Sequence, residues 1–195
     1  MTARDPAEDA HLARRQIPLV GWIDGDRAQR VIAQMLYLRH MDGRAPMTLL
    51  VDSPGGAVVE GLAILDTMDW LGPTAVRTHC CGEAHAIAAL ILAHGRPGER
   101  TAVPEAVLSI SLPWAAPGQD VEPEVQEREL ERLTQVVLEF TARGTGRSAE
   151  DLRADLAAER RFTAAEAVGF GLIDRIVTSP ETSGWRAWVG RFWGR

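Results

Sequence analysis

Cysteine is scarce in this chain, which has only two such residues among 195. Cys80 and Cys81 are adjacent, so they are poorly placed to pair, and no spacing of Cys and His is typical of a zinc site. We interpret both residues as buried free thiols, which behave as small apolar groups. This usage fits a reducing cytoplasm rather than a disulfide-stabilised secreted protein.

Long apolar runs and excess positive charge are also missing. The N-terminal residues have no apolar signal-peptide segment, and no run is long enough to span a bilayer. The formal net charge of −6 argues against a nucleic-acid partner, because affinity for nucleic acid rests on basic contacts to phosphates. We therefore expect a cytoplasmic protein with no membrane span.

A nucleophile is lacking at the point where the sequence pattern would place one. Residues 79–95, HCCGEAHAIAALILAHG, indicate a strand that turns sharply into a helix, with Gly82 allowing the tight turn. Hydrolases build a nucleophile elbow from such a turn, with small residues on either side of a Ser or Cys. Here the turn holds no Ser, and both cysteines come before Gly82.

Strand and helix patterns alternate along most of the chain. Short apolar runs indicate strands at 17–23, 47–51, 74–79, 106–112 and 172–177. Helical spacing indicates helices at 27–41, at 58–70, after Gly82, and at 122–144, 148–159 and 163–171. Asp26 and Ser148 are suited to cap two of these helices, and Gly169 and Gly171 to end the last. The alternation predicts an α/β fold with a parallel sheet covered by helices on both faces.

We divide the chain into three parts. Residues 1–16 form a short polar segment that we expect to be loose, and residues 17–178 form the folded domain. The tail, 179–195, is rich in Trp and Arg, and its aromatic residues lie at helical spacing. Such a helix can lie on a membrane surface or dock into a groove on a protein. Docking on protein is favoured because the rest of the chain is acidic.

Two local patterns each leave two interpretations open. The DSPGG loop, 52–56, presents N–H groups that suit an oxyanion or a peptide backbone, although a plain strand-to-helix turn explains the same spacing. His85 is expected one turn into its helix, where a general base would need a nucleophile within reach, and Cys81 is the only nearby candidate. A lone histidine is more often structural. The acidic run 122–131 is interpreted as a solvated face.

The order of these motifs resembles the ClpP family, the proteolytic subunits of the Clp protease. The resemblance rests on SPGGAVVEGLAILDTMDWLGP, CCGEAHAIAALILAHG, VLSISLP, TGRSAEDL and ERRFTAAEAVGFGLIDRIV, and it runs from about Ile17 to Val177. It implies a crotonase-like spiral fold with parallel sheet repeats and flanking helices. It also implies a long handle helix, here in the region of about 114–144, which joins two seven-membered rings. Family members are serine endopeptidases with a Ser–His–Asp triad and backbone oxyanion donors.

The resemblance places all three triad positions on residues that cannot do the chemistry. The nucleophile falls at Ala86, the histidine at Ser111 and the aspartate at Arg160. Alanine has no nucleophilic atom, serine does not accept a proton near neutral pH, and arginine inverts the orienting charge. The oxyanion donors, which are backbone groups, fall at Gly56 and Ile87. The resemblance thus implies a pseudoprotease, with no cofactor and no metal.

Two departures from the family pattern bear on this expectation. Glu159 is the acid nearest the position of Arg160, but a carboxylate without the other two members has nothing to orient. The segment before Ile17 is shorter than in the family and lacks the spacing of a docking helix, which puts binding of a Clp ATPase in doubt.

Three functions remain in view. The first is a silent subunit that joins a heptameric or tetradecameric ring with an active ClpP-type paralogue and modulates it. The second is a homomeric scaffold that binds peptides without hydrolysis. The third is an enzyme with relocated chemistry, at Cys81 and His85 or at Ser111.

Overall fold

The computed structural model describes residues 6–72, 75–114 and 122–178. The helices are α1 (Pro6–Ala13), α2 (Gly25–Met41), α3 (Val58–Leu71), α4 (Ile87–Ala93), α5 (Pro123–Thr145), α6 (Ala149–Ala157) and α7 (Ala164–Phe170). The strands are β1 (Gln16–Val20), β2 (Met47–Ser53), β3 (Val76–His85), β4 (Arg100–Ala102), β5 (Val107–Ser109), β6 (Arg161–Thr163) and β7 (Arg175–Ile176). The predicted tail helix lies outside the described residues.

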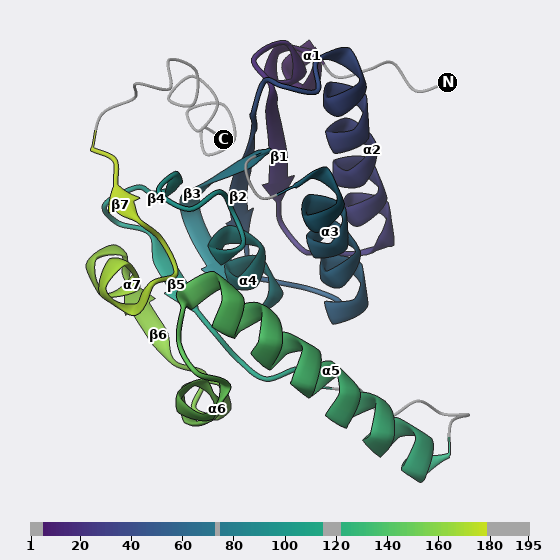
Figure 1. The fold of residues 1–195 in the computed structure, drawn as a ribbon, viewed down its shortest axis with the longest axis vertical. Coiled ribbons are helices and arrows are strands. Elements are labelled where there is room, and N and C mark those ends of the chain that lie inside the picture. The colour runs from purple at the N-terminus through teal and green to yellow at the C-terminus, as the bar shows by residue number, and fades with distance from the viewer. Residues whose placement is uncertain (1–5, 73–74, 115–121, 179–195) are drawn as a thin grey trace, which may run out of the picture.

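The strands form one sheet that is parallel except for β6, with helices flanking it (Figure 1). Its order is β1-β2-β3-β4-β7, and β5 pairs with the end of β3 beyond the stretch that pairs with β4. The α/β prediction is confirmed. The patterns do not indicate β4 or β6, because three residues are too few to show a period. No helix in the described ranges is both long and apolar enough to cross a bilayer.

Strand β3 is longer than predicted because it contains a bulge. Its pairing with β2 shifts between Cys80, opposite Val51, and Ala84, opposite Ser53. The Asp52 side chain accepts a hydrogen bond from the Glu83 N–H in this bulge. A Cβ on Gly82 would lie 2.6 Å from Asp52 Oδ1, so a side chain here would displace the carboxylate that bonds to the bulge. The sequence suggests that Gly82 forms the turn into the helix, but Gly82 lies in the bulge of β3 instead.

The short helix α4 lies in the middle of the core, and all seven of its residues are buried. Its sequence, IAALILA, is apolar on every side, which is typical of a fully buried helix. Helix α3 packs closely against it, because a Cβ on Gly61 would lie only 2.1 Å from Cγ1 of Ile87. The core thus fixes the start of α4.

The N-terminal segment is not loose throughout: α1 contacts β1, and its His11 is buried.

Several helix ends differ from the predictions. Asp24, not Asp26, caps α2 by accepting a hydrogen bond from the Arg27 N–H. Ser148 caps α6 as predicted. Gly171 ends α7 at a φ of +96°, whereas Gly169 lies inside that helix.

Helix α5 projects from the body of the molecule, as a handle would (Figure 1). Its buried residues all lie in its second half, at Val137, Leu138, Phe140 and Thr141. The first half carries mostly charged and exposed side chains, as the acidic run predicts. It therefore makes little contact with the other described residues of the chain.

Arg100 fastens several of these elements together. Its guanidinium donates to both carboxylate oxygens of Asp174, at 2.6 and 3.0 Å, and to the backbone carbonyls of Ala93, Gly144 and Gly171. Burial raises the pKa of Asp174, but the hydrogen bonds from Arg100 outweigh burial and hold that pKa below its ordinary value. A single side chain thus joins β4 to α4, α5 and the segment before β7.

Replacing Arg100 by Met should lower the free energy of unfolding by about 3 kcal/mol, because three carbonyls lose a donor and Asp174 loses its counter-charge. Urea denaturation of the full chain measures this loss. Arg132→Met on the exposed surface of α5 is the matched control and should change the free energy of unfolding little. Equal losses in the two variants would contradict this role.

The same ion pair predicts a pH dependence. The pKa of Asp174 is depressed in the folded state, so the stability that its charge contributes is lost in acid. The difference in the free energy of unfolding between wild type and Arg100→Met should therefore narrow below the ordinary pKa of 3.8.

Candidate active site

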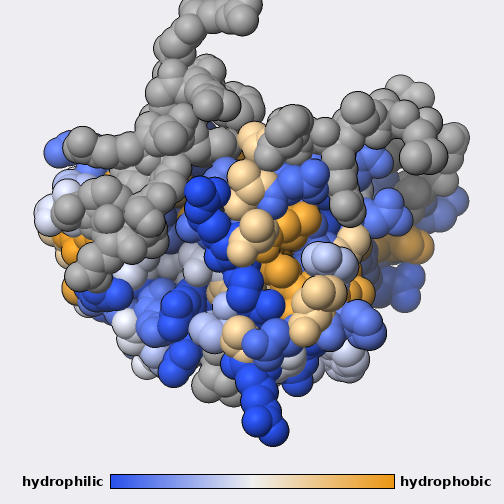
Figure 2. Space-filling view, turned by 90° about the horizontal axis from the view of Figure 1, so that it is seen from above, coloured by the Kyte–Doolittle hydropathy of each residue, from blue (hydrophilic) through white to orange (hydrophobic). Residues whose placement is uncertain are grey.

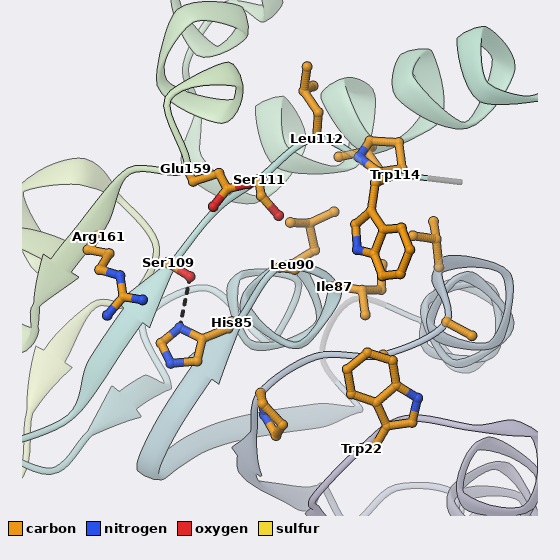
Figure 3. Close-up of a pocket in the computed structure, with 17 residues that line it drawn as sticks. Trp22, His85, Ile87, Leu90, Ser109, Ser111, Leu112, Trp114, Glu159 and Arg161 are labelled. Carbon is orange, nitrogen blue, oxygen red and sulfur yellow. Dashed lines mark hydrogen bonds between the residues drawn. The ribbon is translucent and has the colours of Figure 1, made fainter. Parts of the chain in front are cut away.

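A cavity of about 480 Å³ opens where β3, the loop after β2, the segment after β5 and helix α5 meet (Figure 3). One wall is apolar and includes Trp22, Val58, Ile87, Leu90, Leu112, Trp114 and Val137. The other end is polar and includes His85, Ser109, Ser111, Glu159 and Arg161. A cavity of this size with mixed walls is typical of a ligand site.

Ala86 forms a strained turn between β3 and α4. Its φ of 48° and ψ of −119° are sparsely populated by any residue with a side chain. The backbone is held there by a hydrogen bond from the Ala86 N–H to the Ser109 carbonyl, at 2.9 Å. This strand–turn–helix geometry is that of a nucleophile elbow, with a methyl group where the nucleophile would stand.

The glycine loop after β2 lies directly against this turn. A Cβ on Gly55, which has a φ of +96°, would lie 2.8 Å from the carbonyl oxygen of His85. A Cβ on Gly56 would lie 2.2 Å from the carbonyl oxygen of Ile23. Both glycines therefore allow close approach of backbones. Gly56 and Ile87 border the cavity, as predicted, and their role as oxyanion donors stays a prediction.

His85 is the last residue of β3 rather than part of a helix, so the sequence-based placement is wrong. Its Nδ1 lies 2.8 Å from Ser109 Oγ, and its Nε2 lies 3.1 Å from Glu83 Oε2. The register of β3 against β5 sets His85 opposite Ser109, which explains the first contact. Sequence reasoning did not select Ser109 or Glu83, because a strand register is not visible in periodicity.

Cys81 is not a partner of His85. Its thiol points to the backbone carbonyl of His79, at 4.0 Å, and Cys81 does not line the cavity. Burial raises the pKa of the Cys81 thiol far above its ordinary value, with neighbouring Cys80 and Asp52 adding to the effect. Burial also raises the pKa of Cys80, to about 12. The predicted Cys81–His85 pair is therefore wrong, and both thiols are free, as expected.

The resemblance places the triad aspartate at Arg160, with Glu159 beside it, and the structure sets these two side chains apart. Arg160 donates to Asp155 at 2.8 Å and lies over the rings of Phe162 and Phe170, so it does not line the cavity. Glu159 does line it, and its carboxylate lies on the same side as the Ser111 hydroxyl (Figure 3). The expected charge inversion by Arg160 is therefore absent from the cavity.

Ser111 and Ala86 both line the cavity, so the structure brings two of the three predicted triad positions together. Their correspondence to the family's catalytic residues stays a prediction from the resemblance. No group of three or more His, Cys, Asp or Glu within the described ranges is placed to hold a metal ion.

Replacing Ala86 by Gly should raise the free energy of unfolding by about 1 kcal/mol. Glycine removes a strain of about 1–3 kcal/mol, against a backbone-entropy cost of about 0.5–1 kcal/mol. Chemical denaturation measures the difference. Ala88→Gly, inside α4, is the control and should lower stability by about 1 kcal/mol. Similar losses in both variants would show that Ala86 is not strained.

Comparison with known proteins agrees with this geometry. Residues 5–180 match the family model described as Clp protease. The chain is 38% identical over 156 residues to the ATP-dependent Clp protease proteolytic subunit 1 of Corynebacterium diphtheriae, covering 79% of this chain and 74% of that protein. It is 35% identical over 167 residues to the ATP-dependent Clp protease proteolytic subunit of Borreliella afzelii, covering 85% and 84%. The chain belongs to the Clp protease family.

Proposed function

We propose that this chain is a Clp-type subunit without peptidase chemistry at the family's catalytic position. In this proposal it assembles with an active Clp-type peptidase in a heptameric or tetradecameric ring, in the cytoplasm, and modulates or scaffolds that enzyme. The observation that carries the proposal is the elbow at Ala86, which keeps the strained backbone but holds only a methyl group. A nucleophile elbow that is present without a nucleophile favours a role in binding or assembly.

The replaced positions support a complete loss rather than a weakened triad. Triad members act as a unit, so their removal costs roughly 10⁶-fold in turnover. Ser111 cannot serve as a base near neutral pH, and Glu159 has no imidazole at Ser111 to orient. Backbone donors alone leave a residual rate of about 10³-fold over water.

Two surface features support assembly. The first half of α5 extends from the body with few contacts of its own, as a segment that docks on another subunit would (Figure 1). Large apolar side chains are exposed on α2 and α3, namely Leu36, Tyr37, Met41, Val59 and Trp70. An apolar patch between hydrophilic regions is also visible on the face shown in Figure 2. Contiguous exposed apolar surface is typical of interaction sites.

Native mass spectrometry of the tagged chain, purified from its own host cells, tests the proposal. We expect a ring that contains this chain together with a second Clp-type subunit carrying an intact triad. A complex of this chain alone would contradict the partner role and favour the alternative, a homomeric scaffold that binds peptides. Withdrawing this chain should change the activity of the active subunit; an unaffected partner enzyme would contradict modulation.

A second candidate function rests on the hydrogen-bonded series of Ser109, His85 and Glu83. In it, His85 Nδ1 takes the proton as Ser109 Oγ attacks a carbonyl carbon, while the Nε2–H stays held by Glu83. The protonated imidazole then gives its proton to the leaving group, and water hydrolyses the acyl-serine by the same base. The two distances, 2.8 and 3.1 Å, favour this arrangement over the predicted chemistry at Cys81 or Ser111.

A fluorophosphonate probe tests this candidate, since only an activated serine displaces fluoride from the phosphorus. If the series is catalytic, the folded chain is labelled at Ser109, and Ser109→Ala and His85→Ala abolish the labelling. Ser111→Ala is the matched control, because Ser111 lines the same cavity without a histidine partner. No labelling of the folded wild type would remove this candidate and leave the non-catalytic subunit.

A further inference from the structure

We propose that Arg161 binds the C-terminal carboxylate of a peptide lying in the cavity. The proposal rests on the alternative to the proposed function, a scaffold that binds peptides in this cavity without cutting them. It deepens that function by naming the class of ligand: peptides that end in an apolar residue with a free carboxyl group.

The charge of Arg161 is available for a ligand. Arg161 lines the cavity, and among the residues that the structure describes its side chain has no ion pair or hydrogen bond. Its neighbour Arg160 is engaged by Asp155 and by two phenylalanine rings. A guanidinium presents donors in a fork that matches both oxygens of a carboxylate, so it is suited to recognise this group.

Strand pairing brings further hydrogen-bonding groups to the same place. Arg161 on β6 is opposite Ser109 on β5, which in turn is opposite His85 on β3. The Arg161 guanidinium lies beside the Ser109–His85 hydrogen bond at the polar end of the cavity (Figure 3). The Ser109 hydroxyl has one proton, so it donates to a bound carboxylate only in the tautomer in which His85 Nδ1 donates to Ser109 Oγ.

Two acidic groups, one lining the cavity and one beside it, restrict where an anion can lie. Glu83 accepts from His85 Nε2, so that carboxylate has a partner. Glu159 lines the cavity on the side of Ser111 and repels an anion there. The carboxylate of a ligand is therefore directed to the side of Arg161, the only Arg or Lys among the described residues lining the cavity.

The adjoining wall determines which side chain such a peptide presents. Trp22 and Trp114 are 54% and 76% exposed, although large apolar residues are usually buried. Both indoles extend over the apolar side of the cavity, next to Ile87 (Figure 3). A peptide whose last residues are apolar would bury these aromatic surfaces while its carboxylate reaches Arg161.

Isothermal titration calorimetry of the full chain tests this assignment with two peptides that differ only at their end. The probe is acetyl-Ala-Gly-Ala-Leu as the free acid, compared with its C-terminal amide. We expect the acid to bind about tenfold more tightly, as one charge-assisted contact would provide. The advantage should shrink at high salt, because exposed charges are screened.

Variants distinguish the contribution of the Arg161 guanidinium to binding from that of the rest of the cavity. Arg161→Gln should remove the preference for the acid, and Arg161→Lys should keep only part of it, because an ammonium lacks the fork. The matched control is Arg153→Gln, an exposed arginine on α6 outside the cavity, which should keep the full preference. The melting temperature of each variant verifies folding, and mass spectrometry verifies that the peptides stay intact.

The outcomes separate this assignment from the proposed function. Equal binding of acid and amide would overturn the role of Arg161 while leaving a peptide-binding cavity. If neither peptide binds, both the role of Arg161 and the peptide-binding cavity are overturned. Tight binding of acetyl-Ala-Asp-Ala-Leu amide, matching that of the free acid, would overturn recognition of the C-terminus, because a side-chain carboxylate would then suffice.

Discussion

Close backbone packing around Ala86 is the constraint on which the rest of this structure depends. The chain must leave β3 and enter the buried helix α4 within one residue, which forces a positive φ at Ala86. The loop of Gly55 and Gly56 closes over this turn, with no room for a side chain at either position. These features position the core as well as the cavity. The elbow therefore has a structural role in the core that does not depend on a nucleophile at Ala86.

The polar groups near the elbow differ in how far their hydrogen bonds are satisfied. His85 has partners on both ring nitrogens, through Ser109 and Glu83. Arg160, which would invert the local charge, is instead turned onto phenylalanine rings and Asp155. A buried or half-buried polar group is costly unless it has a partner. His85 and Ser109 thus satisfy each other, whereas Arg161 at the same end of the cavity has no side-chain partner among the described residues.

Patterns of apolar residues predicted most of the fold, because long helices and buried strands repeat with clear periods. They missed the extension of β3, since the bulge at Gly82 has the composition of a turn. The family resemblance, rather than these patterns, grouped four site residues, and they do share one cavity: Ala86, Ser111, Gly56 and Ile87. Sequence patterns could not identify Ser109, because its contact with His85 depends on the register between β3 and β5. Nor could they show that Arg160 turns away while Glu159 and Arg161 enter the cavity, because this depends on local backbone geometry around Glu159, whose φ is +50°.

The proposed absence of hydrolysis also bears on which side chains this cavity can hold. Each turnover of a peptidase creates a new carboxylate in the cleft, and a free guanidinium there would retain the product and slow its release. A subunit that does not cut is not subject to this penalty. An arginine facing the cavity then adds affinity for peptide ends without inhibiting a reaction. Ala86 and Arg161 are thus consistent with the two proposals: a subunit with no nucleophile at Ala86 has no reason to exclude a carboxylate-binding cation, and such a cation would favour retention of a peptide over its turnover.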